Sequence, residues 1–389
     1  MNRSDAAACR EISALHATLA GLCAVLVGIG LARFAYTPLI PALIDAQWFT
    51  AAEAAYLGAA NLAGYLAGAL AARPMASARP AALVLRTMMA LATATFFASA
   101  MPLSFAWFFV WRFASGFAGG VLMVLAAPTV LPHVPPARRG LAGGAIFTGV
   151  GLGIAASGTL VPLLLDLGLV ATWCGLGALA LLLTALAWPG WPRDGVPPAS
   201  PDPLVARTGG ALRALYVEYG LNAFGLVPHM VFLVVYIAHG LGEGLDAGAG
   251  YWVLFGVGAV LGPLLAGHLA DRIGFAWALR LAFGVQAVAV ALAVLPTGAL
   301  GLALSSLVIG ALVPGVVPLV LGRVHELAPP EQTRAAWSMA TVAFAVGQAA
   351  GAYGLSWLFA STGDYGLLFS LGAAAILTAL LIDLAFGRR

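Results

Sequence analysis

Long apolar segments alternate with short polar connections along almost the whole chain. A membrane-spanning helix needs about 20 mostly apolar residues, and the hydropathy pattern supplies twelve segments of that kind. They cover residues 14–44, 51–72, 80–100, 103–131, 138–165, 168–189, 211–238, 247–270, 276–295, 297–322, 334–361 and 363–386. The pattern therefore predicts an all-α integral membrane protein with twelve transmembrane helices.

One connection differs from the others in length and composition. Residues 190–210 are polar and contain five prolines within Trp191–Pro203, a composition typical of a linker without regular structure. This linker separates six predicted spans from six. We expect an N-terminal six-helix bundle over residues 1–189, a cytoplasmic linker over 190–210 and a C-terminal six-helix bundle over 211–389.

Three short repeats support this division. The run Gly30–Pro38 (GLARFAYTP) returns as Gly220–Pro228 (GLNAFGLVP), with six of nine positions matching or nearly matching. Residues 66–73 resemble 265–272 at the end of the second span of each half, and residues 135–138 resemble 329–334 after the fourth. Repeats in the same order and with the same predicted sidedness indicate parallel, pseudo-symmetric halves.

The basic residues indicate the orientation in the membrane. All 18 are arginine, and apart from Arg33 and Arg112 they lie in or beside every second connection. The intervening connections contain acidic residues but no arginine. Because basic residues favour the cytoplasmic side, the sequence predicts a multi-pass inner-membrane protein with both termini in the cytoplasm.

Composition excludes several classes of function. A chain that is 62% hydrophobic and only 8% charged is far from a soluble domain, which is about 25% charged. The absence of lysine excludes Schiff-base chemistry and an ATP-binding P-loop. The net charge of +3 comes from scattered arginines, so no nucleic-acid partner is expected. Three cysteines indicate neither a disulfide framework nor a metal site. We find no paired catalytic groups, and we expect no enzyme activity and no cofactor.

Several motifs resemble the major facilitator superfamily (MFS). Gly267–Gly274 (GHLADRIG) is similar to the family's loop signature, and Arg112–Gly120 resembles its buried-arginine motif in span four. Gly30–Pro38 and the region 250–267 resemble the YbfB-type branch. The resemblance implies a transporter of two six-helix bundles that exposes a central site to each side in turn; we expect it to act as a monomer in the lipid bilayer.

Two arginines lie deep in predicted spans of the first half. A charge in hydrocarbon costs several kcal/mol, so such residues are usually functional. Arg33 is predicted to bind an anion at a central cavity; the alternative is that carbonyls freed at Pro38 satisfy it. For Arg112 the resemblance implies a role in proton coupling or gating, and we include it among the substrate-binding candidates. The alternative is a bond to the backbone of span one.

The second half offers candidates for proton transfer. Glu218 and His229 are ionisable residues well inside a span, and either side chain could hold and release a proton. Alternatively, Glu218 extends to the membrane surface or pairs with Arg213, and His229 is simply hydrogen-bonded within the bundle. Polar or aromatic residues that could contact substrate, or could instead join helices, are Tyr36, Asn222, His229 and Gln348.

The loop signature suggests a gate. An acid at a helix end can meet the N-terminus of a neighbouring helix, and an arginine can latch it. Asp271 and Arg272 would form such a cytoplasmic latch, with Arg334 or Arg280 as the partner.

These features predict a proton-coupled secondary transporter for a small organic solute. We expect the solute to be an anion because both mid-span arginines are in one half. The alternative is a proton-driven efflux antiporter for amphipathic or drug-like compounds. Span five lacks the glycine–proline dipeptide of the family's antiporter signature, which weakens that alternative.

Overall fold

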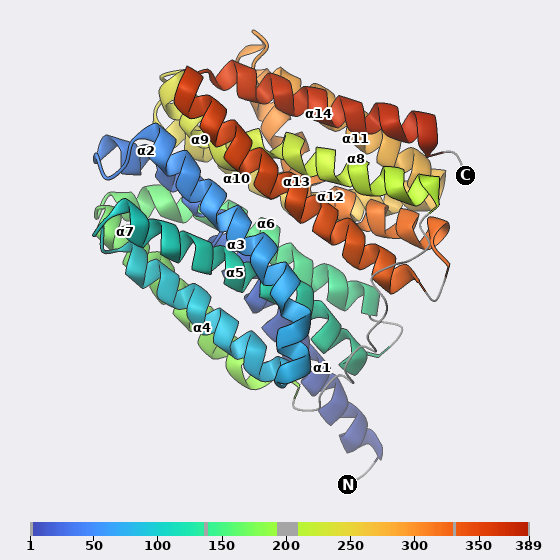
Figure 1. Ribbon diagram of the computed structural model, residues 1–389. Coiled ribbons are helices and arrows are strands. Elements are labelled where there is room, and N and C mark those ends of the chain that lie inside the picture. The colour runs from blue at the N-terminus through green and yellow to red at the C-terminus, as the bar shows by residue number, and fades with distance from the viewer. Residues whose placement is uncertain (1–2, 136–138, 193–208, 330–331, 388–389) are drawn as a thin grey trace. The chain divides into compact units, whose positions relative to one another are not determined.

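The computed structural model is all-helical over the residues that it describes (Figure 1). These are residues 3–135, 139–192, 209–329 and 332–387, excluding the side chains of 3–13, 139–141, 271, 333–335 and 338. The α-helices are α1 (Arg3–Val25), α2 (Tyr36–Asp45), α3 (Ala51–Ala78), α4 (Ala81–Ser99), α5 (Phe105–Val130), α6 (Arg139–Leu165), α7 (Leu169–Ala187), α8 (Gly210–Val227), α9 (Leu233–Val235), α10 (Leu245–Ile273), α11 (Phe275–Leu292), α12 (Gly298–Leu327), α13 (Thr333–Thr362) and α14 (Tyr365–Phe386).

Five short segments complete the helical structure of the described residues. One π-helical segment lies within the first predicted span, between α1 and α2. Two more lie within the seventh, before and after α9. Two 3₁₀ turns end α5 and α7. These segments are η1 (Leu26–Leu31), η5 (Pro228–Phe232), η6 (Tyr236–Gly240), η2 (Leu131–His133) and η4 (Trp188–Gly190).

The twelve predicted spans are confirmed. In the described part of the chain, twelve helical stretches are long and apolar enough to cross a membrane by length and composition. The first joins α1, η1 and α2, and the seventh joins α8, η5, α9 and η6. Residues 193–208, most of the predicted linker, lie outside the described residues.

Several helices begin at residues that satisfy their free amide groups. At α3, Thr50 and Glu53 form a reciprocal capping box, with Thr50 N donating to Glu53 Oε2 (2.9 Å) and Glu53 N to Thr50 Oγ1 (3.2 Å). Ser104 caps α5 by accepting from Trp107 N at 3.1 Å. Asp364 caps α14 by accepting from Leu367 N at 3.2 Å. All three caps lie at span ends that the arginine pattern predicts to be outside.

The chain forms two compact units. Unit 1 comprises residues 1–36 and 63–198, and unit 2 comprises residues 37–62 and 199–389. In unit 1, α1 packs on α6 and α4 packs on α5 and α7; in unit 2, α10 packs on α12, and α8 packs on α13 and α14. This grouping reflects packing, whereas the predicted halves rest on the sequence repeat, so those halves stay a prediction.

Candidate functional site

The first span changes its helical geometry around Arg33. The α-helix gives way to the π-helical segment η1, then to a hydrogen-bonded turn over residues 32–35, and α2 begins at Tyr36. Pro38 has no amide hydrogen, and its ring would clash with the carbonyl four residues earlier in a continuous helix. The proline therefore disfavours regular α-helix at the turn that precedes α2. π-Helical turns are rare and are often found at functional sites.

The second copy of the repeat behaves in a similar way. In Gly220–Pro228, α8 continues to Val227 and the π-helical segment η5 begins at Pro228. The interruption precedes the proline in the first copy and starts at the proline in the second. A π-helical segment therefore overlaps the start of the first repeat copy and the end of the second, at positions that are not equivalent, and only the first copy carries an arginine.

Arg112 bonds the interrupted segment. Its Nη1 donates to the carbonyl of Ala32 at 2.9 Å, and Ser115 Oγ donates to the same carbonyl at 2.9 Å. Its guanidinium carbon lies 4.1 Å from the ring centroid of Tyr36, and the residue is only 4% exposed. A bond to the backbone of span one was the structural alternative for Arg112, and the structure contains that bond. Tyr36 stacks on Arg112 and is itself buried.

Arg33 lies beside this centre in unit 1. Its guanidinium carbon is 5.1 Å from the ring centroid of Phe34 and 5.2 Å from that of Tyr65 on α3, and the residue is half-buried. A cation over an aromatic face gains about 0.5–2 kcal/mol, depending on how far it is removed from water. The Arg33 charge also acts on Arg112. The sequence prediction thus found two cations that unit 1 brings together with Tyr36, and it missed Tyr65.

Asn222 and His229 bond to other helices of unit 2. Asn222 Nδ2 donates to Gln286 Oε1 at 2.6 Å. His229 Nε2 is 2.7 Å from Ser305 Oγ, and Ser305 Oγ donates to the carbonyl of Ala289 at 2.6 Å. Since that hydroxyl proton is directed at Ala289, His229 donates from Nε2 and its neutral form carries the lone pair on Nδ1. Both side chains are fully buried, which favours the alternative that they join helices.

Gln348 lies next to the second interrupted segment. Its Nε2 is 3.4 Å from the sulfur of Met230 in η5, and the residue is 1% exposed. Thr37 Oγ1 donates to the Met230 carbonyl at 2.7 Å. Unit 2 therefore brings Gln348 and Thr37 together around one residue of the widened helix.

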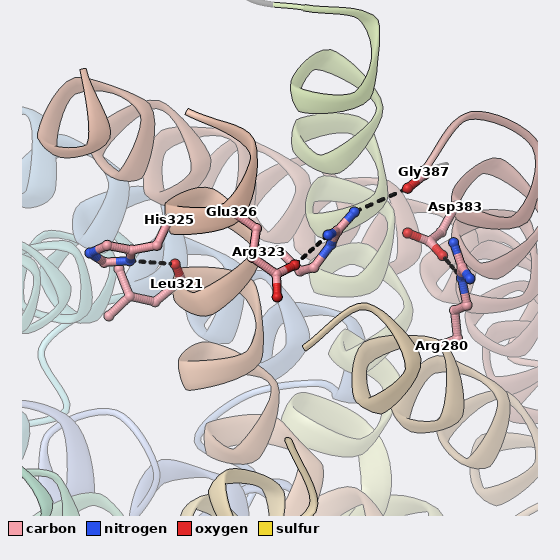
Figure 2. A network of polar contacts seen from close by, with 7 residues as sticks. All are labelled: Arg280, Leu321, Arg323, His325, Glu326, Asp383 and Gly387. Atoms are coloured by element: carbon pink, nitrogen blue, oxygen red, sulfur yellow. Dashed lines mark hydrogen bonds and ion pairs between the residues drawn. The ribbon is translucent and has the colours of Figure 1, made fainter. Parts of the chain in front are cut away.

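A charge cluster, buried except for Glu326, lies at the end of unit 2 where α14 finishes. Figure 2 shows Arg280 from α11 donating to Asp383 of α14, and Arg323 from α12 bonded to Glu326 and to the carbonyl of Gly387. Arg280 is 8% and Asp383 1% exposed. Arg323 Nη2 reaches Gly387 O at 3.0 Å, and a cation at a helix C-terminus is stabilised by the helix dipole.

Glu218 belongs to this electrostatic environment. It is 1% exposed on α8, and the charges of Asp383, Arg323 and Arg280 act on its carboxyl. Among the described residues, neither Glu218 oxygen has a hydrogen-bond partner. The side chain is therefore buried in unit 2 and does not extend to the surface.

The predicted latch is placed only in part. Arg272 is exposed in the last turn of α10, whereas the side chains of Asp271 and Arg334 lie outside the described residues. Arg280, considered as a partner for Asp271, is bonded to Asp383 instead. Sequence reasoning missed that pair. The available signal was that charges inside spans usually pair with one another, and that both residues lie near the cytoplasmic ends predicted for their spans.

Comparisons with known proteins agree with the helical architecture. A family model described as "Uncharacterised MFS-type transporter YbfB" matches residues 25–384. A solved structure described as a D-xylose–proton symporter matches with a TM-score of 0.70 and 17% identity, over 95% of this chain and 96% of the other. At that identity the likeness shows the fold alone. A search of curated proteins finds no match.

The family match settles two of the sequence predictions. The MFS fold predicted from the loop and span-four motifs is confirmed, and the members of this family are transporters rather than enzymes. The chain belongs to the YbfB-type family of MFS transporters.

Proposed function

We propose that this transporter moves a small organic anion together with protons across the inner membrane. Two six-helix halves, residues 1–189 and 211–389, would alternate access to a central site, joined by the cytoplasmic linker 190–210. Both termini would lie in the cytoplasm, and the functional form would be a monomer. The family membership supports secondary transport, and the name of the D-xylose–proton symporter suggests proton coupling by analogy.

One observation carries the proposed anion specificity. Arg33 and Arg112 both lie at the interrupted segment of span one, each guanidinium lies over a tyrosine ring, and the charge of Arg33 acts on Arg112. Arginine recognises carboxylate and phosphate with paired donors in a fixed geometry. In this account Arg112 fixes the segment through Ala32 and adds positive potential, and Arg33 contacts the substrate. Gln348 and Tyr36 are the next contacts that we propose, followed by Asn222 and His229.

Glu218 is the proposed proton carrier. A buried carboxyl without a hydrogen-bond partner can gain and lose a proton without breaking a protein–protein bond. His229 is the weaker candidate, because a second proton on Nδ1 would have no acceptor among the described residues. The cytoplasmic gate of Asp271, Arg272 and Arg334 remains part of the proposal on the strength of the loop signature.

A ligand screen by thermal shift tests the proposed substrate class. Purified protein would be heated at two pH values with small mono- and dicarboxylates, sugar acids, inorganic phosphate and, as the uncharged control, D-xylose. Since a ligand that binds only the folded state stabilises it, we expect at least one anion to raise Tm by about 2–5 °C. Arg33→Gln should remove the shift, whereas Arg73→Gln, an exposed arginine on α3, should keep it.

Two outcomes would contradict the proposal. Stabilisation by neutral sugars alone would exclude an anionic substrate, and an anion shift that survives in Arg33→Gln would move the binding site elsewhere. Stabilisation by amphipathic cations, accompanied by export of those compounds from cells, would favour the efflux antiporter.

A further inference from the structure

A groove on the surface of unit 1 lies between two neighbouring helices. It is lined along α4 by Ala90, Thr93, Ala94 and Phe97, and along α7 and η4 by Leu181, Thr184, Ala185, Trp188 and Pro189, with a volume of about 680 Å³. Both helices are candidate membrane spans. The groove is therefore open to the hydrocarbon of a bilayer, and it takes no part in the transport site described above.

The groove is apolar for a reason that the sequence makes clear. Ala90, Ala94 and Ala185 leave space where neighbouring positions carry larger side chains, and these alanines are exposed. The two threonines at its base are buried and bonded to each other, with 3.1 Å between their hydroxyl oxygens. Phe97, Leu181 and Trp188 form the walls and are 38%, 53% and 46% exposed. The surface that remains suits an acyl chain.

A cation lies at one end of this groove. Arg86 is one helical turn before Ala90 on α4, its Nε donates to the Trp188 carbonyl at 3.0 Å, and its guanidinium carbon is 5.5 Å from the Trp188 ring centroid. Among the described residues, its two Nη groups make no hydrogen bond or ion pair. The side chain is thus fixed against Trp188 with several donors still available. The arginine pattern places this end at the cytoplasmic face.

We propose that the groove binds one anionic glycerophospholipid of the inner leaflet. An acyl chain would lie along α4 from Ala90 to Phe97, a length of about 10 Å at 1.5 Å per residue, and the headgroup phosphate would accept hydrogen bonds from Arg86. Trp188 has an indole suited to the membrane interface, and it holds the arginine in place. Basic pockets between spans on the cytoplasmic side have the chemistry to bind anionic headgroups.

Competitive lipid retention tests this inference directly. The full-length protein would be purified in detergent, incubated with equimolar phosphatidylglycerol and phosphatidylcholine of the same chain length, and analysed by native mass spectrometry. We expect preferential retention of one phosphatidylglycerol. Arg86→Gln should weaken that retention about five- to tenfold, as expected for one arginine near a charged surface. Arg79→Gln, an exposed arginine seven residues earlier, should leave it unchanged.

Further experiments separate the contribution of the acyl chain from that of the headgroup. Ala94→Phe and Ala185→Leu each fill the groove from one helix, and both should reduce phosphatidylglycerol retention while leaving the size-exclusion profile unchanged. Soluble glycerol phosphate should not compete at equal concentration. Equal retention of the two lipids by the wild type, equal behaviour of the Arg86 and Arg79 variants, or full competition by glycerol phosphate would each overturn the proposal.

Discussion

Glu218 and Asp383 are both buried carboxyls of unit 2, but their bonding differs. Asp383 accepts from Arg280, whereas the Glu218 oxygens have no hydrogen-bond partner among the described residues. Removing one member of a buried ion pair leaves a charge without compensation, and it commonly costs 3–5 kcal/mol. A carboxyl without hydrogen bonds has fewer interactions to lose.

The two acids therefore give a matched pair of isosteric substitutions. We expect Asp383→Asn to lower the free energy of unfolding by about 3 kcal/mol or more, because it leaves Arg280 buried without a counter-charge. Glu218→Gln should change it by less than about 1 kcal/mol. Denaturant unfolding of the purified protein provides the measurement. Equal losses would show that Glu218 is a bonded member of the charge cluster and not a free proton carrier.

At the scale of elements, the interrupted first span depends on close helix contact. Gly30 lies where a Cβ atom would be 2.7 Å from the carbonyl oxygen of Gly149 and 2.8 Å from the Cα of Gly153 on α6. In return, a Cβ atom at Gly149 would be 2.7 Å from the carbonyl oxygen of Leu22. Backbone atoms cannot move aside as a flexible side chain can, so these glycines allow span one to pack directly on α6.

Two alanine substitutions on α6 test this packing with a built-in control. Gly149→Ala should destabilise the protein by about 1–3 kcal/mol, because the added methyl group overlaps the backbone of span one. Gly144→Ala, on the same helix, should be neutral or slightly stabilising, since a Cβ atom there has nothing within 4 Å and alanine favours helix. The melting temperatures of the two variants should therefore move apart; if they fall together, close packing is not what these glycines provide.

At the scale of the whole molecule, the membrane spans could be predicted from the sequence, but the contacts between residues of different spans could not. Because a helix must be long and apolar to cross a bilayer, a run such as residues 365–386 can be recognised as a span from the sequence alone. The bond from Arg112 to Ala32 could only be offered as an alternative, because 80 residues separate its ends. The Arg280–Asp383 pair, 103 residues apart, was missed for the same reason.

The internal repeats and the helical spacing also predicted some features of the structure and not others. Aligning Gly30–Pro38 with Gly220–Pro228 indicated an ancestral duplication, but it did not predict the π-helical segments, which lie at the start of the first copy and at the end of the second. Asn222 was recognised as a polar residue within a span, and its partner Gln286 was not, because helical spacing shows the face of one helix and not the residue opposite.

Proton-driven uptake into proteoliposomes tests the whole account most directly. The vesicles would be acidic outside, and the solute would be the anion with the largest thermal shift. We predict accumulation by the wild type, an initial rate at least about tenfold lower in Arg33→Gln, as expected when a charged partner is lost, and partial recovery in Arg33→Lys. Glu218→Gln should still exchange the anion across the membrane without accumulating it, and Arg73→Gln should match the wild type. Wild-type accumulation by Arg33→Gln would contradict the account.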